Sequence, residues 1–402
     1  MMTRHYVKTI VWTVIIFACV AGLFRSLERT NSWHIFGVPP MQLLFADTIG
    51  VLAASDCQAK GFNVYRDNPC DPWGRIQVLG TATSYLARLG FDMADGYWLG
   101  WTLVVLFWGA ALLLAQPSNP LRAGLIFVFL ISPAVMLGCE RANIDLFLFL
   151  LITLAVLLAT RPSLMAQGTA VIPIWLAAII KLYPVAAGGA LLVCLWKRVV
   201  NRWVWLACLL GFGGWALLNF SEVKAITMAA PKPYGALTFG GELLFRYLAD
   251  GFSEATRLAT VITFFLVVLS SIFLITLRPL DVRGATPFQK ASYLVGLAVL
   301  LFCFVATTNY DYRNIYFILL LPFFFFVLET RTDRGWCVIQ GATLLLILFS
   351  FWREVLPWTL TYYLLESGFA WLMFVPLVAM AIAITGFDDL LRKEIRTLTW
   401  QT

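Results

Sequence analysis

The sequence predicts an all-α integral membrane protein, and three observations support this class. Apolar side chains make up 61% of the 402 residues and charged ones only 13%. The mean hydropathy is +0.83. Apolar runs long enough to cross a bilayer, about 20 residues each, recur along the chain. This composition excludes the soluble globular classes.

The apolar runs predict about ten full membrane spans. They cover residues 9–24, 97–115, 121–138, 144–160, 203–220, 257–277, 291–308, 314–328, 335–351 and 368–386. Arg4 and Lys8 precede the first run, which we expect to be an uncleaved anchor with a cytoplasmic N-terminus. The same orientation makes the C-terminal tail cytoplasmic.

One run does not fit a single span. A helix over residues 169–196 would be about 42 Å long, too long for one crossing and too short for two. Pro184 interrupts the run, and Lys181 puts a charge in its middle. We expect a broken helical hairpin whose short helices meet at residues 181–184. A membrane tolerates such a break only beside protein or a wet cavity.

We expect residues 1–402 to form one membrane domain with two larger segments on its outer face. The first, residues 25–96, contains amphipathic stretches that predict short helices outside the spans. The second, residues 221–257, is rich in Pro, Gly and aromatic residues. A third and shorter segment, residues 351–368, is expected to lie along the membrane interface before the last span. The net charge of +7 does not indicate a nucleic-acid partner, because the Lys and Arg residues are scattered between the apolar runs as topology signals.

Asp47 is the candidate catalytic residue. It directly follows an apolar stretch, so we expect it at the membrane interface, where partial loss of water favours a basic carboxylate. Such a carboxylate suits a general base that takes the proton of an acceptor hydroxyl. The alternative is that Asp47 caps the N-terminus of a short helix.

Cys57 and Cys70 lie 13 positions apart in the first outer segment. That segment faces the oxidising side, which permits a disulfide that braces it, with two free thiols as the alternative. We expect no metal site, because His5 and His34 are the only histidines in the chain.

A charged turn, GCERANIDLF, separates two apolar runs at residues 138–147. The topology puts Glu140 and Arg141 at the outer boundary of the membrane. A surface ion pair, with Asn143 capping the next helix, is one interpretation of this turn. The functional interpretation is that the guanidinium of Arg141 binds an anionic headgroup.

A second polar cluster, TTNYDYRNIYF, occupies residues 307–317 on the same expected face. Its tyrosines fit an interfacial belt. Its Arg313, together with Arg141 and Lys181, places three cations next to hydrocarbon, which favours a phosphate held at the lipid boundary. The residues that we expect to support this site are Glu140, Asn143, Tyr183, Tyr310 and Asp311.

Four motifs, in this order, resemble the polytopic bacterial glycosyltransferases of family 87, within the GT-C superfamily. They are Asp47 with the later GFNVY at 61–65, RANIDLFLFLL at 141–151, KLYPVAAGGALL at 181–192 and NYDYRNIYFILLLP at 309–322. Two positions depart from the family pattern, because Ala142 stands where Gly is usual and Leu182 where Pro is usual. The C-terminal part adds only a compatible topology.

The resemblance implies a GT-C-like helical bundle that moves a hexose or pentose, usually with inversion, from a polyprenyl-phosphate donor to a hydroxyl of a glycolipid or glycan. It implies a reaction on the outer face of the bacterial plasma membrane, among membrane lipids, without a cofactor. Asp47 matches the acidic residue proposed as general base in that family. The phosphate-binding role of Arg141, Lys181 and Arg313 is our own inference from charge and topology.

Two other functions remain open. A transporter or flippase for lipid-linked glycans would place ionisable residues within its spans and often shows repeat symmetry. A glycan polymerase or ligase would carry Arg and His in a large late outer loop, whereas residues 221–257 contain no His. The clustering of Glu140, Arg141, Asp311 and Arg313 at one expected face favours the glycosyltransferase over a transporter, and the moderate length of residues 221–257 favours it over a polymerase or ligase.

Overall fold

The computed structural model describes residues 2–196, 199–230, 237–242, 244–245, 253–306, 309–330, 334–355 and 360–387. Within these ranges the chain is mostly helical. The sheet in this part of the chain is one antiparallel pair, β1 (Thr238–Phe239) with β2 (Asn309–Tyr310). The predicted all-α class is confirmed.

Seven described helices are long and apolar enough to cross a membrane, or up to nine if two bent helix pairs each count as one span. The chain is therefore a multi-pass membrane protein. The elements that supply the seven are α1 (Met2–Thr30), η3 (Met93–Asp95) with α4 (Gly96–Ala115), α14 (Glu254–Thr276), α15 (Pro287–Ala306), η4 (Asp311–Leu320) with α16 (Leu321–Thr330), α17 (Arg334–Trp352) with η5 (Arg353–Val355), and α18 (Leu360–Thr385).

One of the two bent pairs stands where a straight span was expected, at residues 121–138, whereas the other bends at the end of the span expected at residues 203–220. α5 (Pro120–Leu130) and α6 (Pro133–Glu140) meet at 53°. Pro133 opens α6, and its missing N–H interrupts the helical hydrogen bonds at this corner. α11 (Val199–Leu218) and α12 (Phe220–Ala229) form the second pair, with a bend of 84°.

Four shorter helices occupy residues 144–195. α7 (Ile144–Ala159) and α8 (Leu164–Thr169) lead into α9 (Val171–Ile180), and α10 (Val185–Leu195) follows. The chain between α9 and α10 is not helical, and Lys181 there has extended backbone. Pro184 is the residue that precedes α10.

The centre of the bundle is formed by α7, α10, α15 and η4, and α15 packs on each of the other three. η4 is a 3-10 helix of ten residues, nine of them buried, although such helices rarely exceed four residues. Ser292 of α15 donates a hydrogen bond of 2.6 Å to the carbonyl of Leu319 and so supports the end of η4.

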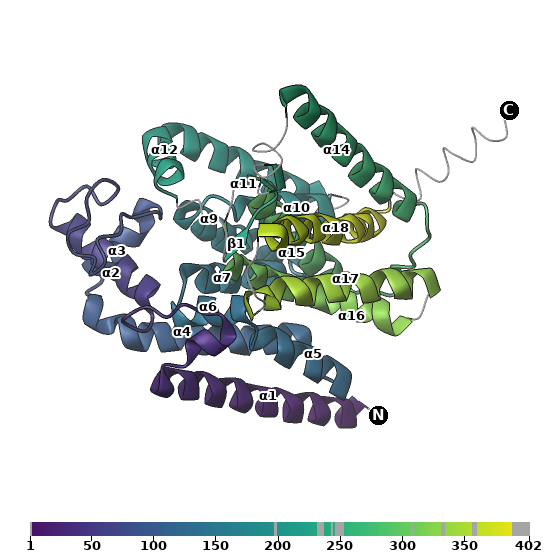
Figure 1. The fold of residues 1–402 in the computed structure, drawn as a ribbon, viewed down its shortest axis with the longest axis horizontal. Coiled ribbons are helices and arrows are strands. Elements are labelled where there is room, and N and C mark those ends of the chain that lie inside the picture. Colours follow the sequence, from purple (N-terminus) through teal and green to yellow (C-terminus); the bar gives the residue numbers. More distant parts are fainter. Residues whose placement is uncertain are drawn as a thin grey trace.

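The segment between α1 and α4 lies at one end of the bundle (Figure 1). α2 (Ala46–Ala59) and α3 (Tyr85–Arg88) lie at the left in Figure 1, and α12 lies at the same end. α1 runs along the lower edge, with its N-terminal end on the opposite side. The short helices η1 (Trp33–Phe36) and η2 (Thr81–Ser84) belong to the same segment as α2. Residues 231–236, 243 and 246–252 of the expected second outer segment lie outside the described residues.

Candidate functional site

Three hydrogen bonds fasten the start of α2 to the turn between α6 and α7. Two are donated by backbone N–H groups and one by a hydroxyl, and backbone carbonyls accept all three. They run from Phe45 N to Glu140 O (2.8 Å), from Asp47 N to Arg141 O (3.0 Å) and from Thr48 Oγ1 to Ala142 O (2.7 Å). This register places Asp47 beside Arg141, although 94 positions separate the two residues.

The turn itself contains a residue in left-handed backbone. Ala142 has φ of +42°, a conformation that glycine adopts without the steric cost of a Cβ, which is on the order of 1 kcal/mol. This is the position at which the chain departs from the Gly of the resembling family. The conformation gives a physical reason for Gly there, and the turn forms here with Ala nonetheless.

The carboxylate of Asp47 accepts hydrogen bonds on both oxygens. Arg75 Nη1 donates to Oδ1 over 2.9 Å, and Asn143 Nδ2 donates to Oδ2 over 2.6 Å. Asp47 lies in the first turn of α2, and the N-cap residue is Phe45. The alternative that Asp47 caps this helix is therefore wrong. Asn143 does cap α7, because its Oδ1 accepts from the backbone N of Asp145.

A cavity of about 520 Å³ opens beside Asp47. Asp47, the predicted catalytic residue, lines this cavity. Two of the three predicted phosphate-binding cations, Arg141 and Lys181, also line it. The supporting residues Asn143 and Tyr310 line it as well. Arg313, Glu140, Tyr183 and Asp311 are not part of the lining.

Arg141 is only weakly engaged within the protein. Its Nε is buried and has no hydrogen-bond partner in the described part of the chain. The nearest carboxylate oxygen, Oε2 of Glu140, is 3.9 Å away, and the guanidinium lies 5.9 Å from the centre of the Tyr310 ring. A desolvated guanidinium with an unused donor is suited to binding an anion in the cavity.

Glu140 is not a surface residue. Its side chain is 1% exposed, and Oε1 accepts a 2.9 Å hydrogen bond from the backbone N of Met41. The interpretation of Glu140 and Arg141 as a surface ion pair is therefore wrong. Glu140 instead holds the chain that leads into α2 against the α6 end, because both Met41 and Phe45 bond to it.

Arg313 is drawn away from the cavity by a buried carboxylate. Asp145, with a side chain 1% exposed, forms an ion pair with Lys181, and Arg313 Nε lies 3.4 Å from its Oδ2. The guanidinium of Arg313 lies 4.9 Å from the centre of the Tyr183 ring. A direct contact between Arg313 and a ligand in the cavity, as expected from the sequence, does not follow from this geometry. Asp145 orients Lys181, which does reach the cavity lining.

Tyr183 and Asp311 act as structural supports behind the site. The Tyr183 hydroxyl lies 2.5 Å from the hydroxyl of Tyr316 in the core. Asp311 is fully buried, and its Oδ2 lies 3.8 Å from Arg353 Nη2. Arg353 Nε in turn lies 3.1 Å from Glu354 Oε1.

The Arg353 cluster fixes the position of β2. Glu354 Oε1 accepts from the backbone N of Leu237 (3.0 Å), and the Leu237 carbonyl accepts from Asp311 N (3.0 Å). These bonds lie next to the β1–β2 pair, so they hold Tyr310 at the cavity wall. The sequence suggested that residues 351–368 lie along the membrane interface, but Arg353 and Glu354 are buried in the bundle.

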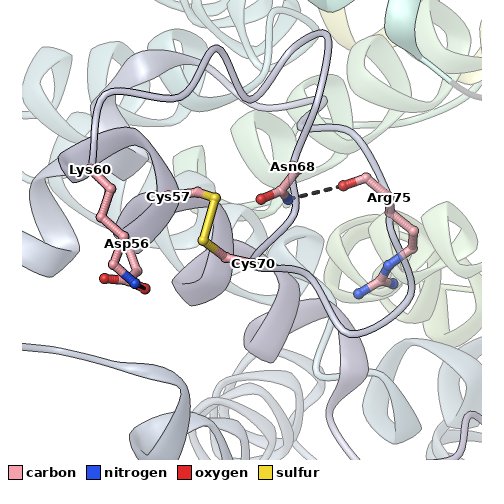
Figure 2. Close-up of a disulfide and its surroundings, with 6 residues drawn as sticks. All are labelled: Asp56, Cys57, Lys60, Asn68, Cys70 and Arg75. Atoms are coloured by element: carbon pink, nitrogen blue, oxygen red, sulfur yellow. Dashed lines mark hydrogen bonds and ion pairs between the residues drawn. A yellow bond between two sulfur atoms is a disulfide. The ribbon is translucent and has the colours of Figure 1, made fainter.

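Arg75 is the site residue that the sequence did not reveal. It lines the cavity and ends a loop braced by the disulfide between Cys57 and Cys70, whose Cα atoms are 5.6 Å apart. Figure 2 shows this bond, and also the 2.9 Å hydrogen bond from Asn68 Nδ2 to the Arg75 carbonyl. One signal was present in the sequence, namely Asp71 four positions before Arg75.

Arg75 stays charged although it is partly buried. Burial lowers the pKa of Arg75, but the hydrogen bonds that Arg75 donates to Asp71 and the charge of Asp47 more than offset this and raise the pKa above its usual value. Arg75 also stacks on Trp73, with 4.4 Å from the guanidinium carbon to the ring centre. The cavity therefore has a third fixed cation beside Arg141 and Lys181.

Replacing Cys70 by Ser is expected to lower the free energy of unfolding by about 2–4 kcal/mol, because the disulfide no longer restricts the unfolded chain. Thermal denaturation of the detergent-solubilised protein measures this as a lower Tm. The matched control is Cys337→Ser, which changes an exposed free thiol. A Tm equal to that of the wild type, or one that still falls when Cys70→Ser is treated with a reductant, would contradict the prediction.

The comparisons with known proteins add no assignment, because the sequence matches no protein-family model and no curated protein. The resemblance to the glycosyltransferases of family 87 rests on the four motifs given above. Among the described residues, no three His, Cys, Asp or Glu side chains form a group that could hold a metal ion.

Proposed function

We propose that the chain is a membrane glycosyltransferase. It transfers a monosaccharide from a polyprenyl-phosphate carrier to a hydroxyl of a glycolipid or glycan, on the outer face of the bacterial plasma membrane. One observation carries the proposal, namely that a single cavity brings the Asp47 carboxylate together with the weakly engaged guanidinium of Arg141. Transfer of a sugar from a phosphate carrier needs a base that takes the proton of the acceptor hydroxyl. It also needs a cation that stabilises the charge on the departing phosphate.

The reaction follows from these positions. Asp47 accepts the proton of the acceptor hydroxyl, whose oxygen forms a bond to the anomeric carbon of the sugar. The bond between that carbon and the phosphate oxygen breaks, and the electron pair leaves with the polyprenyl phosphate. Arg141 and Lys181 stabilise the charge that develops there. A direct displacement of this kind inverts the configuration of the sugar.

Arg313 has a positioning role in this proposal. It shares Asp145 with Lys181, and the two ion pairs hold the carboxylate from both sides. Lys181 has three N–H donors, so its ammonium is able to bind a phosphate while one donor remains on Asp145. Arg313 thus orients Lys181 without touching the donor.

The direct test is transfer by the purified protein in liposomes. Labelled polyprenyl-phosphate mannose, glucose, galactose and arabinose are supplied in turn, together with a bacterial lipid extract as the source of acceptors. We expect label in a new glycosidic bond with at least one donor. Movement of an intact donor across the bilayer without a new bond would instead identify a transporter, the function that the buried ion pairs of Asp145 would otherwise favour.

Arg141→Gln is expected to raise the KM for the donor about 10- to 150-fold, because one charge-assisted hydrogen bond contributes about 1.5–3 kcal/mol. Steady-state transfer at varied donor concentration measures the effect. Arg29→Gln is the matched control, since Arg29 is exposed in the last turn of α1 and does not line the cavity. An unchanged donor KM in Arg141→Gln would remove Arg141 from the site.

A further inference from the structure

Both oxygens of the proposed base, Asp47, already accept hydrogen bonds within the protein. A base must have a carboxylate oxygen free to accept a hydrogen bond from the acceptor hydroxyl, and Arg75 Nη1 already donates to Asp47 Oδ1 over 2.9 Å. With Asn143 on the other oxygen, the carboxylate is held by two donors in the structure. A base in this state needs one of these donors to be drawn away at the moment of transfer.

The guanidinium of Arg75 is anchored mainly through Nε and Nη2, whereas Nη1 has a single partner. Its Nε lies 3.0 Å from Asp71 Oδ2, and its Nη2 donates to Asp71 Oδ1 (3.3 Å) and to the carbonyl of Ala46 (2.7 Å). Nη1 donates to Asp47 alone. Since an Arg side chain has five N–H donors, one N–H of Nη1 has no partner in the described part of the chain.

The anchored side of Arg75 is rigid. Asp71 has a side chain 1% exposed, and its Oδ2 also accepts from the backbone N of Arg75 over 2.7 Å. Trp73 lies under the guanidinium, and the Cys57–Cys70 disulfide closes the preceding loop. The Nη1 end is therefore able to change its partner without any movement of the loop.

Arg75 shares its cavity with two further cations and with the carboxylates of Asp47 and Asp71. Arg75, Arg141 and Lys181 line the same cavity, and Arg141 keeps a buried Nε without a hydrogen-bond partner. A phosphate bound between these cations competes with the Asp47 carboxylate for Nη1, since both are oxyanions that a guanidinium binds well.

We infer that Arg75 is shared between Asp47 and the carrier phosphate, and that binding of the phosphate takes the Nη1 hydrogen bond from Asp47 and thereby releases the base. The inference rests on the proposed function. Its consequence is an order of events: Asp47 becomes a competent base only when a donor occupies the cavity, so the donor binds before the acceptor reacts.

The test measures binding of undecaprenyl phosphate, a carrier without a sugar, to the full chain in nanodiscs of zwitterionic lipid. Asp47→Asn is expected to bind this probe about 3- to 10-fold more tightly, because the competing carboxylate is gone. Arg75→Gln is expected to bind it about 10-fold more weakly. In the Arg75→Gln background, Asp47→Asn is expected to have little effect, which is the coupling that a double-mutant cycle detects.

Asp56→Asn is the matched control, because Asp56 lies on the same helix and pairs with the exposed Lys60. It is expected to leave the affinity unchanged. An Asp47→Asn affinity equal to or weaker than the wild type overturns the inference, and so does equal tightening in both backgrounds, which would indicate a general charge effect without sharing. If Arg75→Gln does not fold, Arg75→Lys takes its place, since an ammonium lacks the fork that spans Asp71 and the phosphate.

The failure of this inference is distinguishable from the failure of the proposed function. Binding of undecaprenyl phosphate involves no transfer, whereas the proposed function is decided by the formation of a glycosidic bond in liposomes. Transfer without coupling between Asp47 and Arg75 would overturn only the sharing of Arg75. Absence of any binding of the probe to the wild-type chain also overturns the sharing.

Discussion

Asp47→Asn is expected to lower the kcat of sugar transfer by about 10²- to 10⁴-fold, the range that removal of a general base produces. Asn is close in size and keeps an oxygen for Asn143, so the hydrogen-bonded start of α2 remains in place. What is lost is the ability to accept a proton. The measurement is single-turnover transfer with saturating donor.

The donor KM separates the loss of the base from a damaged site. We expect it not to rise in Asp47→Asn, because the cations on the cavity wall are unchanged. Asp56→Asn, on the same helix but away from the cavity lining, should keep the kcat of the wild type. Full transfer activity in purified Asp47→Asn would exclude Asp47 as the base.

Asp145→Asn is expected to lower the free energy of unfolding by about 3–5 kcal/mol. The substitution leaves the charges of Lys181 and Arg313 without the carboxylate that pairs with both, and an unpaired charge in such a buried place is costly. Denaturation in mixed detergent micelles, monitored by circular dichroism, measures the change.

Asp281→Asn is the matched control for Asp145→Asn. Asp281 lies 3.0 Å from Arg283 in an exposed ion pair, and such pairs contribute about 0–1 kcal/mol. The two substitutions remove the same charge, so their difference isolates the effect of burial. Equal stability of both variants would contradict the view that Asp145 neutralises two cations inside the bundle.

The membrane class and the charged turn followed from the sequence because they depend on local patterns. Apolar runs of spanning length require helices in a bilayer, since every backbone polar group must be bonded internally. A proline and a lysine inside residues 169–196 predicted a break, and the chain between α9 and α10 is not helical. The short motifs around Asp47 and Arg141 predicted site residues, and the structure brings these two to one cavity.

The bends within the apolar runs were less predictable, because hydropathy alone does not show where a helix is interrupted. Residues 121–138 read as one span, yet α5 and α6 meet there at 53°. Residues 314–328 also read as one span, and the structure divides them between the 3-10 helix η4 and α16. Hydropathy reports the length of a buried segment, whereas packing against α15 decides how tightly it winds.

The sequence by itself determined that this chain crosses a membrane several times and that an acid and several cations interrupt its apolar runs. Only the tertiary structure decided which charges meet. Arg75 reaches Asp47 across 28 positions, while Arg313 is held by Asp145 across 168. Hydropathy is a property of consecutive residues, but a buried charge takes the partner that the packing of distant elements brings near, and no local pattern contains that information.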